Sequence, residues 1–158
     1  MRFGKHTNGI SCEYEMQEYM QKWLKKKGFR FIPELLVSEA HRRPDFLVLK
    51  NGNVLINIEA KCNDWKCLLN QLKDNSVYCN YSFAFIPDYC LTPQWFKRAL
   101  LETNFGLIIY NYKNHTITEV LEAHLNKGES WDKELNQKIK KYVDINSKVI
   151  RTKVKKFW

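Results

Sequence analysis

Two short apolar stretches with a polar turn between them form the most regular pattern in the chain. Residues 43–50 and 54–61 carry closely spaced Val, Leu, Ile and Phe side chains, which favour β-strands. The intervening Asn51-Gly52-Asn53 contains residue types that tolerate positive φ. The pattern therefore predicts a β-hairpin.

The length of the loop decides which side chains of the hairpin meet. With three loop residues, Asp45 falls opposite Glu59, and Lys61 shares their face because strand side chains alternate with a period of two. A two-residue loop would instead pair Asp45 with Ile58 and turn Glu59 to the other side. We therefore expect a charged group at one end of the hairpin. The other face would consist of Phe46, Val48, Val54, Ile56, Ile58 and Ala60.

The chain before the hairpin is predicted to form one helix and one strand. The helix would begin at Ser11 as its N-cap and end at Gly28, after an irregular lead over residues 1–10. Residues 29–37 have the pattern of a strand, which Pro33 interrupts because proline cannot donate to a ladder.

After the hairpin, helices and strands alternate along the chain. Residues 81–87 are almost continuously apolar, as in a central strand that is covered on both faces. This order predicts an α/β fold with a mixed sheet flanked by helices. The other predicted elements are a helix capped at Asn63 or Asp64 and running to about Asn75, a helix from Thr92-Pro93 to Leu101, strands at 105–112 and 116–121, and a helix beginning at Ser130.

Length and composition predict one soluble, cytoplasmic domain. The 158 residues are 44% hydrophobic, which suffices for one compact core. No stretch approaches the roughly 20 apolar residues of a membrane span, and no apolar signal region follows Met1. Five cysteines, an odd number without CxxC pairs, indicate reduced thiols that pack in the core. We place a main domain at 1–128 and a basic C-terminal extension of it at 129–158.

The formal net charge of +9 is concentrated at the two ends of the chain. Residues 1–30 carry seven Lys or Arg against three Glu, and residues 131–158 carry nine against three acids. Such an excess attracts polyanions such as DNA through phosphate contacts and counterion release. A Lys-rich coding bias would produce the same excess, so the C-terminal run is either a DNA-binding arm or a solvated tail.

The two carboxylates predicted to face each other need a positive partner. Acids directly across a strand pair repel, and a half-buried carboxylate is costly to leave unpaired. Mg²⁺ suits such a place, since it needs only one or two carboxylates together with waters and substrate phosphates. Lys61 would lie where it can stabilise charge that develops on a phosphate. The alternative is an exposed hairpin with an incidental ion pair.

The spacing of these residues resembles the signature of a nuclease superfamily. Pro44-Asp45, thirteen intervening residues and Glu59-Ala60-Lys61 are similar to the PD-(D/E)xK motif of restriction-endonuclease-like and Holliday-junction-resolvase-like enzymes. The order of the elements over residues 11–112 also resembles that superfamily's core. The resemblance implies a restriction-endonuclease-like three-layer αβα fold and a magnesium-dependent DNA endonuclease, in which Mn²⁺ can replace Mg²⁺.

The resemblance also implies roles for individual residues of the site. Asp45 and Glu59 would bind the metal, the Ala60 carbonyl would add a ligand, and Lys61 would support the attacking water. Glu13 resembles the glutamate that the first helix of such nucleases contributes to the metal site. Its alternative role is to favour the helix N-terminus electrostatically.

Three further residues are candidates for contacting substrate. Gln71 resembles a helix glutamine that follows the lysine in several branches of the superfamily. Arg42 and Arg43 precede the catalytic strand, where either can hold a phosphate. His41, in the same loop, is interpreted as a solvated residue rather than a general base.

Two other classes of function remain to be weighed against a nuclease. A binding module of the same fold, acting in DNA repair or recombination without cutting, would have no reason to keep all three charges. A small-molecule enzyme would show another motif, and the sequence contains no P-loop, no Rossmann glycines and no Ser/His/Asp grouping. The sequence leaves open the DNA substrate and the oligomeric state, for which a homodimer is one option.

Overall fold

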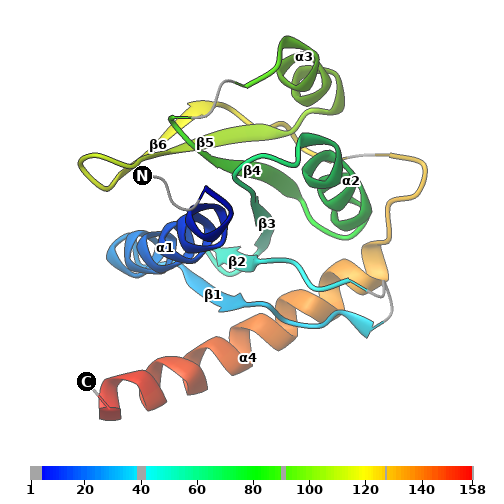
Figure 1. Cartoon of the computed structure of the whole chain (residues 1–158). Coiled ribbons are helices and arrows are strands. Elements are labelled where there is room, and N and C mark those ends of the chain that lie inside the picture. Colours follow the sequence, from blue (N-terminus) through cyan, green and yellow to red (C-terminus); the bar gives the residue numbers. More distant parts are fainter. Residues whose placement is uncertain (1–4, 39–41, 90–91, 127, 158) are drawn as a thin grey trace.

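The computed structural model has three layers, with one sheet between helices (Figure 1). Within the described residues the chain forms a six-stranded mixed sheet and four helices, which confirms the predicted α/β class. The structure describes residues 5–38, 42–89, 92–126 and 128–157, with the backbone alone for 5–11 and 148–157.

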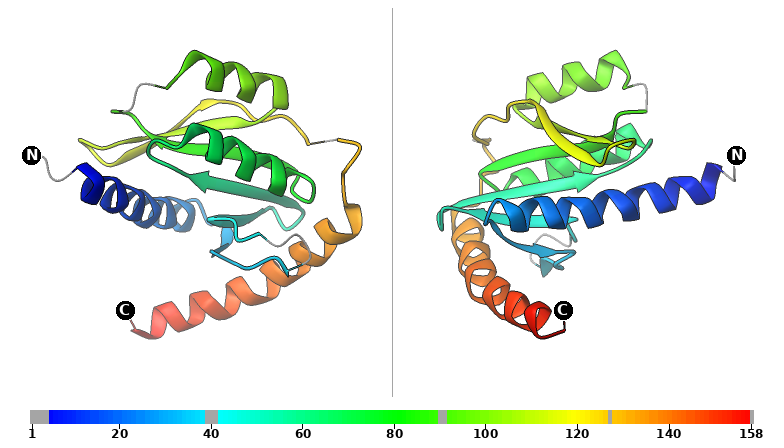
Figure 2. Two further views of the ribbon diagram at one scale, coloured as in Figure 1. Left: turned by 45° about the vertical axis from the view of Figure 1, so that its right-hand side comes forward. Right: turned by 90° about the vertical axis from the view of Figure 1, so that its left-hand side faces the viewer.

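The helices divide unevenly between the two faces of the sheet. Helix α1 (Lys5–Lys26) packs on one face. The opposite face is covered by α2 (Trp65–Ser76), α3 (Gln94–Thr103) and α4 (Lys133–Phe157). Figure 2 shows α4 beside the β1 and β2 end of the sheet, away from α3.

The strands lie across the sheet in the order of the sequence. Strands β3, β4 and β5 are parallel neighbours, whereas β1, β2 and β6 pair antiparallel with the strands beside them. The start of β2 therefore lies beside the end of β3, at the edge where the parallel strands also end. The strands are β1 (Arg30–Pro33), β2 (Phe46–Lys50), β3 (Val54–Ala60), β4 (Tyr81–Pro87), β5 (Gly106–Asn111) and β6 (Thr116–Leu121).

The β2–β3 hairpin has the predicted register. Phe46 pairs with Ile58, so one further step places Asp45 opposite Glu59. In the loop, Asn51 adopts a φ of 55° and the following glycine a φ of 77°, a left-handed region that both residue types tolerate. The loop of three residues thus sets the alternation that brings the two acids to one side.

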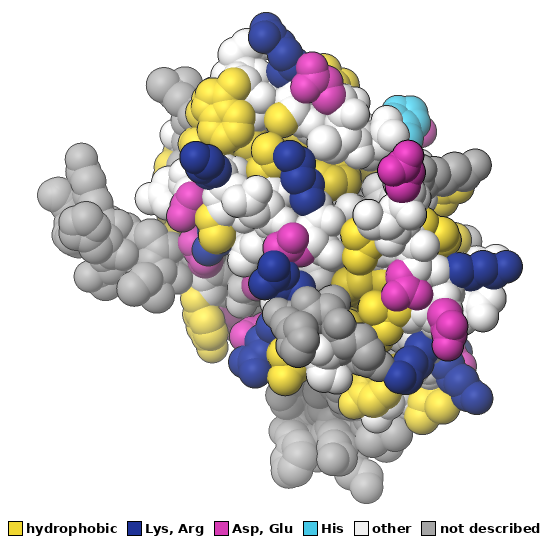
Figure 3. Space-filling model, turned by 90° about the vertical axis from the view of Figure 1, so that its right-hand side faces the viewer, with side chains coloured by type: hydrophobic (Ala, Val, Ile, Leu, Met, Phe, Trp, Pro, Cys, Tyr) yellow, Lys and Arg dark blue, Asp and Glu magenta, His cyan; other side chains and the backbone are white. Residues whose placement is uncertain are grey.

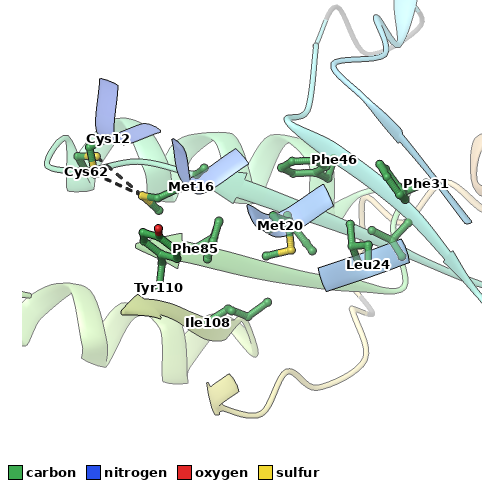
Figure 4. Packing of buried hydrophobic residues seen from close by; sticks show 13 residues of the cluster. Cys12, Met16, Met20, Leu24, Phe31, Phe46, Cys62, Phe85, Ile108 and Tyr110 are labelled. Atoms are coloured by element: carbon green, nitrogen blue, oxygen red, sulfur yellow. Dashed lines mark hydrogen bonds between the residues drawn. The ribbon is translucent and has the colours of Figure 1, made fainter. Parts of the chain in front are cut away.

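The face of the hairpin under α1 packs on apolar side chains. Figure 4 shows Met16 and Met20 of α1 near Phe46 of β2 and Phe85 of β4. All four side chains are buried. The predicted apolar face is confirmed for Phe46, Val48, Ile58 and Ala60, with Ile56 partly buried against them.

The opposite face of the same strands is also covered. Leu47 and Leu49 of β2 pack in one cluster with residues of α4, including Ile139 and Val143. Ala84 and Ile86 of β4 pack in another cluster with α2 and α3. Strand β4 is therefore covered on both faces, as predicted, and the first part of residues 129–158 belongs to the core of the domain.

Two boundaries near the N-terminus differ from the sequence prediction. Helix α1 begins at Lys5, so residues 5–10 are helical where an irregular lead was expected. Strand β1 ends at Pro33 because the next residue, Glu34, turns to a φ of 51°. Val37, the predicted end of this strand, forms only an isolated bridge with Arg42.

Most of the described cysteines pack in the interior of the domain, as predicted. The side chains of Cys12, Cys62 and Cys79 are buried, and that of Cys67 is half-buried. Met16 Sδ lies 3.6 Å from Cys12 Sγ and 3.9 Å from Cys62 Sγ, as the dashed lines of Figure 4 mark.

The helices were also compared with the length and apolar character of a membrane span. Among the described residues, no helix has the length and apolar character needed to cross a membrane.

Candidate metal and catalytic site

Asp45 and Glu59 meet where β2 begins and β3 ends. The backbone N–H of Asp45 donates to Glu59 Oε1 at 3.3 Å. In return, the backbone N–H of Ala60 donates to Asp45 Oδ2 at 2.7 Å. Each carboxylate is thus tied to the other strand of the hairpin, and both are fixed at the same edge of the sheet.

Pro44 affects the backbone carbonyl of Ala60, the third predicted metal ligand. Two steps beyond the Phe46–Ile58 pair, the register places Ala60 opposite Pro44. Proline has no N–H, so the ladder cannot supply a donor to that carbonyl. The N–H and C=O of one strand residue point to the same side, and the Ala60 N–H points to Asp45. The Ala60 oxygen therefore lies on the Asp45 side of β3.

The environment of the two acids disfavours two negative charges. Glu59 is only 1% exposed, and burial together with repulsion from Asp45 raises its pKa to about 8. Burial also raises the pKa of Asp45 to about 6, and the nearby charge of Glu13 adds to this shift. The positive charge of Lys61 lowers both pKa values but does not cancel the effect of burial. A bound cation would relieve this shortage of positive charge.

Two asparagines hold the other oxygen of Glu59. Asn57, two residues earlier on β3, donates through Nδ2 to Glu59 Oε2 at 3.2 Å. Asn75, at the end of α2, donates through Nδ2 to the same oxygen, also at 3.2 Å. The sequence prediction missed both residues. Asn57 carried a usable signal, since it is a polar residue on the Glu59 face of a buried strand, whereas Asn75 reaches the site only through the packing of α2.

Lys61 and Glu13 lie at the margin of this pair. Lys61 follows β3 directly, is half-buried, and acts electrostatically on both Asp45 and Glu59. Glu13 reaches the site from α1 and is near enough to Asp45 to raise its pKa. In the part of the chain that the structure describes, no third His, Cys, Asp or Glu completes a metal-binding group. Hydrogen bonds therefore join Asp45 and Glu59 directly, whereas Lys61 and Glu13 act on Asp45 through their charges, and the effect of Glu13 is the larger of the two.

The predicted substrate-binding residues surround the site without joining the carboxylate pair. Gln71 lies one turn before Asn75 on α2, and its side-chain Oε1 is buried with no hydrogen-bond partner among the described residues. Arg42 Nη2 pairs with Asp74 Oδ2 of α2 at 2.9 Å, and both side chains are well exposed. Arg43 is exposed, and His41 lies outside the described residues.

Charged side chains are mixed on one face of the molecule. In Figure 3, described Lys and Arg side chains alternate with Asp and Glu side chains, and hydrophobic side chains lie between them. On that face the net charge of +9 is not gathered into a single basic patch.

Comparisons with known proteins support the fold and give no function. No protein-family model matches the sequence, and no curated protein matches it. Among solved structures, the chain is similar to SPO1766 from Silicibacter pomeroyi, a protein of unknown function, with a TM-score of 0.54 and 19% sequence identity. The match covers 81% of this chain and 83% of that one. At this identity the likeness concerns the α/β arrangement alone.

Proposed function

We propose that this chain is a metal-dependent DNA endonuclease with a restriction-endonuclease-like fold, which hydrolyses phosphodiester bonds at Asp45, Glu59 and Lys61. The observation that carries the proposal is the pairing of two largely buried carboxylates beside a lysine at one strand edge. Two acids in such a place destabilise the fold, and apolar residues of similar volume would stabilise it more. A catalytic function that requires these charged side chains would explain why the protein has them at this place.

The donors of the site suit a hard divalent cation. Asp45 and Glu59 would hold Mg²⁺ or Mn²⁺ through carboxylate oxygens, and the Ala60 carbonyl would add a third oxygen. Glu13 on α1 is a further acid whose charge acts on Asp45. Such an ion polarises the scissile phosphate and lowers the pKa of the attacking water. In Mg²⁺ sites that act on phosphate substrates, the protein commonly supplies only some of the ligands, and waters and phosphate oxygens fill the remaining positions.

Lys61 would contribute a positive charge that does not depend on the metal. Lys61 directly follows β3, and its positive charge lowers the pKa of both carboxylates. From there it can donate hydrogen bonds to the phosphate as negative charge develops in the transition state. We assign Lys61 to this stabilisation, and Asp45 and Glu59 to holding the cation.

DNA is the proposed substrate because of the charge around the site. Arg42 and Arg43 are exposed immediately before β2, where they can contact phosphates beside the scissile bond. Gln71 is half-buried, and its amide oxygen has no hydrogen-bond partner in the part of the chain that the structure describes. That amide is the proposed contact with substrate on the α2 side. A net charge of +9 favours binding to a polyanion as a whole.

Cleavage assays with three variants test the proposal. Wild type, Asp45→Ala, Lys61→Ala and Lys50→Ala are assayed on supercoiled plasmid, linear duplex, single strands and a four-way junction, with Mg²⁺, Mn²⁺ or chelator. Lys61→Ala should lower the cleavage rate at least about 100-fold while metal binding survives, because it removes only transition-state stabilisation. Asp45→Ala should lose both cleavage and metal binding. Lys50→Ala, at the exposed far end of the same hairpin, is the matched control and should cut normally.

The outcome separates an enzyme from a binding module. A metal-dependent product that disappears in Asp45→Ala and Lys61→Ala supports the nuclease. Binding of DNA without cleavage of any substrate by the wild type would instead favour a non-catalytic nucleic-acid-binding module of the same fold.

A further inference from the structure

A chain of buried hydrogen bonds reaches Glu59 from the segment that follows β6. Asn126 Nδ2 donates to Ser82 Oγ at 3.1 Å. The hydroxyl of Ser82 donates in turn to Asn57 Oδ1. Asn57 Nδ2 then donates to Glu59 Oε2 at 3.2 Å. Asn57 and Ser82 are fully buried, so these hydrogen bonds are shielded from water.

A second branch reaches the same oxygen from α2. The Tyr78 hydroxyl donates to Asn75 Oδ1, and Asn75 Nδ2 donates to Glu59 Oε2 at 3.2 Å. Both Asn75 and Tyr78 are almost completely buried. Glu59 Oε2 is therefore the point where two separate chains of donors end.

Backbone carbonyls fix the direction of both branches. Asn126 Nδ2 also donates to the Cys79 carbonyl at 3.0 Å, and Asn75 Nδ2 donates to the Gln71 carbonyl at 3.0 Å. A carbonyl can only accept, so in each amide the nitrogen must face it and the oxygen must face away. Every donor in the two branches then points toward Glu59.

We propose that Asn57 and Asn75 are positioning residues, which hold Glu59 by Oε2 and thereby turn Oε1 toward Asp45 and the cation. This inference rests on the proposed function. Glu59 Oε1 lies on the Asp45 side, because it accepts from the Asp45 backbone N–H. Residues that orient a metal ligand in this way commonly change metal affinity or activity by about 10–100-fold when they are removed.

Asn136 provides a matched comparison for the two positioning residues. It is 3% exposed, and its side chain donates to the Tyr78 carbonyl at 2.8 Å and to Asn80 Oδ1 at 3.2 Å. Loss of this buried amide should cost stability as loss of Asn57 or Asn75 does. It should leave the orientation of Glu59 unchanged, because Asn136 bonds to the Tyr78 backbone carbonyl and not to the hydroxyl that reaches Asn75.

The test measures Mn²⁺ affinity by electron paramagnetic resonance, together with melting temperature and cleavage kinetics. Asn57→Ala and Asn75→Ala should each weaken Mn²⁺ binding about 10–100-fold and lower kcat, with little change in KM for DNA. Asn136→Ala should melt earlier but bind Mn²⁺ like the wild type. Ser82→Ala and Tyr78→Phe, which remove only the hydroxyl behind each asparagine, should weaken Mn²⁺ binding by a smaller factor.

Each possible result supports or overturns the inference. Wild-type Mn²⁺ affinity in Asn57→Ala and Asn75→Ala would overturn it while leaving the nuclease proposal intact. Equal weakening in Asn136→Ala would also overturn it, since the effect would then be general. If the alanine variants fail to fold, unchanged affinity in both Ser82→Ala and Tyr78→Phe would overturn it. A wild type that binds no Mn²⁺ would overturn the proposed function and the inference together.

Discussion

At the end of β3 the side chains on both faces are buried, but the two faces differ in chemistry. Toward α1, Ile58 and Ala60 pack with Met16 and other apolar side chains. Toward α2, Asn57 and Glu59 are just as inaccessible, yet their contacts are hydrogen bonds. One face therefore stabilises the fold, and the other is a polar site that the fold supports.

The energies of the two faces explain this division of roles. Full burial of an aliphatic or methionine side chain contributes about 1.5–3 kcal/mol. A buried acid destabilises the fold unless it is paired, and a fully satisfied polar network fixes geometry more than it adds stability. The apolar face can offset that cost, so the polar face can be kept for chemistry. The following predictions test this difference, from the largest effect to the smallest.

Removal of a core side chain from the α1 face should produce the largest loss of stability. Met20 is completely buried, so Met20→Ala removes contacts and leaves a cavity, which costs about 2–5 kcal/mol. Urea denaturation measures the change. Ile145→Ala on α4, where the side chain is 53% exposed, is the control and should change stability by less than about 0.5 kcal/mol. A loss below 1 kcal/mol for Met20→Ala would mean that α1 is not packed as described.

Neutralising one acid on the polar face should increase the stability of the metal-free protein, whereas truncation of a core side chain lowers it. The pKa values of about 6 for Asp45 and about 8 for Glu59 lie above those of exposed acids, so the folded state binds more protons than the unfolded state between roughly pH 4 and 8. Stability without metal therefore falls as pH rises through this window. Asp45→Asn removes one charge and its repulsion of Glu59.

Asp45→Asn should consequently raise the melting temperature in chelator at pH 8, by about 2–4 °C for each kcal/mol of relieved repulsion. The difference from wild type should shrink toward pH 4, where both acids are protonated in the folded state and no longer repel each other. Differential scanning calorimetry across pH 4–9 measures it. Added Mg²⁺ should stabilise the wild type and not the variant. A variant that melts earlier than wild type at pH 8 would contradict the electrostatic account.

The basic end of α4 should affect DNA binding without affecting the core. Leu135, Ile139 and Val143 supply the buried contacts of α4, so removal of residues 148–158 should leave the fold intact. Each lost phosphate contact should reduce the slope of log affinity against log salt by about 0.9. Fluorescence anisotropy at several salt concentrations measures the slope. An unchanged slope would show that this end is not a DNA-binding arm.

The exposed ion pair at the edge of the polar face should matter least for stability. Arg42 and Asp74 are 48% and 40% exposed, so Arg42→Ala should change the free energy of unfolding by at most about 1 kcal/mol. Its effect on DNA affinity should be larger than that of Asp74→Ala, which leaves the arginine charge in place. Equal effects of the two substitutions on DNA affinity would remove Arg42 from the proposed phosphate contacts.

The hairpin was predictable from sequence because its pattern is local. A loop of three residues and an alternation of period two are enough to place Asp45 opposite Glu59. Asn75 was not predictable as a partner of Glu59, because its role depends on how α2 packs on the sheet. The early start of α1 at Lys5 was missed because no clear capping signal precedes it. The strand β1 was predicted too long, although it ends at Pro33, the residue expected to interrupt it.

The central claim is that Asp45 and Glu59 together hold a divalent cation. Crystals soaked in Mn²⁺ and measured for anomalous scattering test it directly. The account predicts one strong peak between the two carboxylates, about 2.0–2.3 Å from an oxygen of each, and no such peak in Asp45→Asn. A wild-type map with no peak there, or with Mn²⁺ only at surface carboxylates elsewhere, would contradict it.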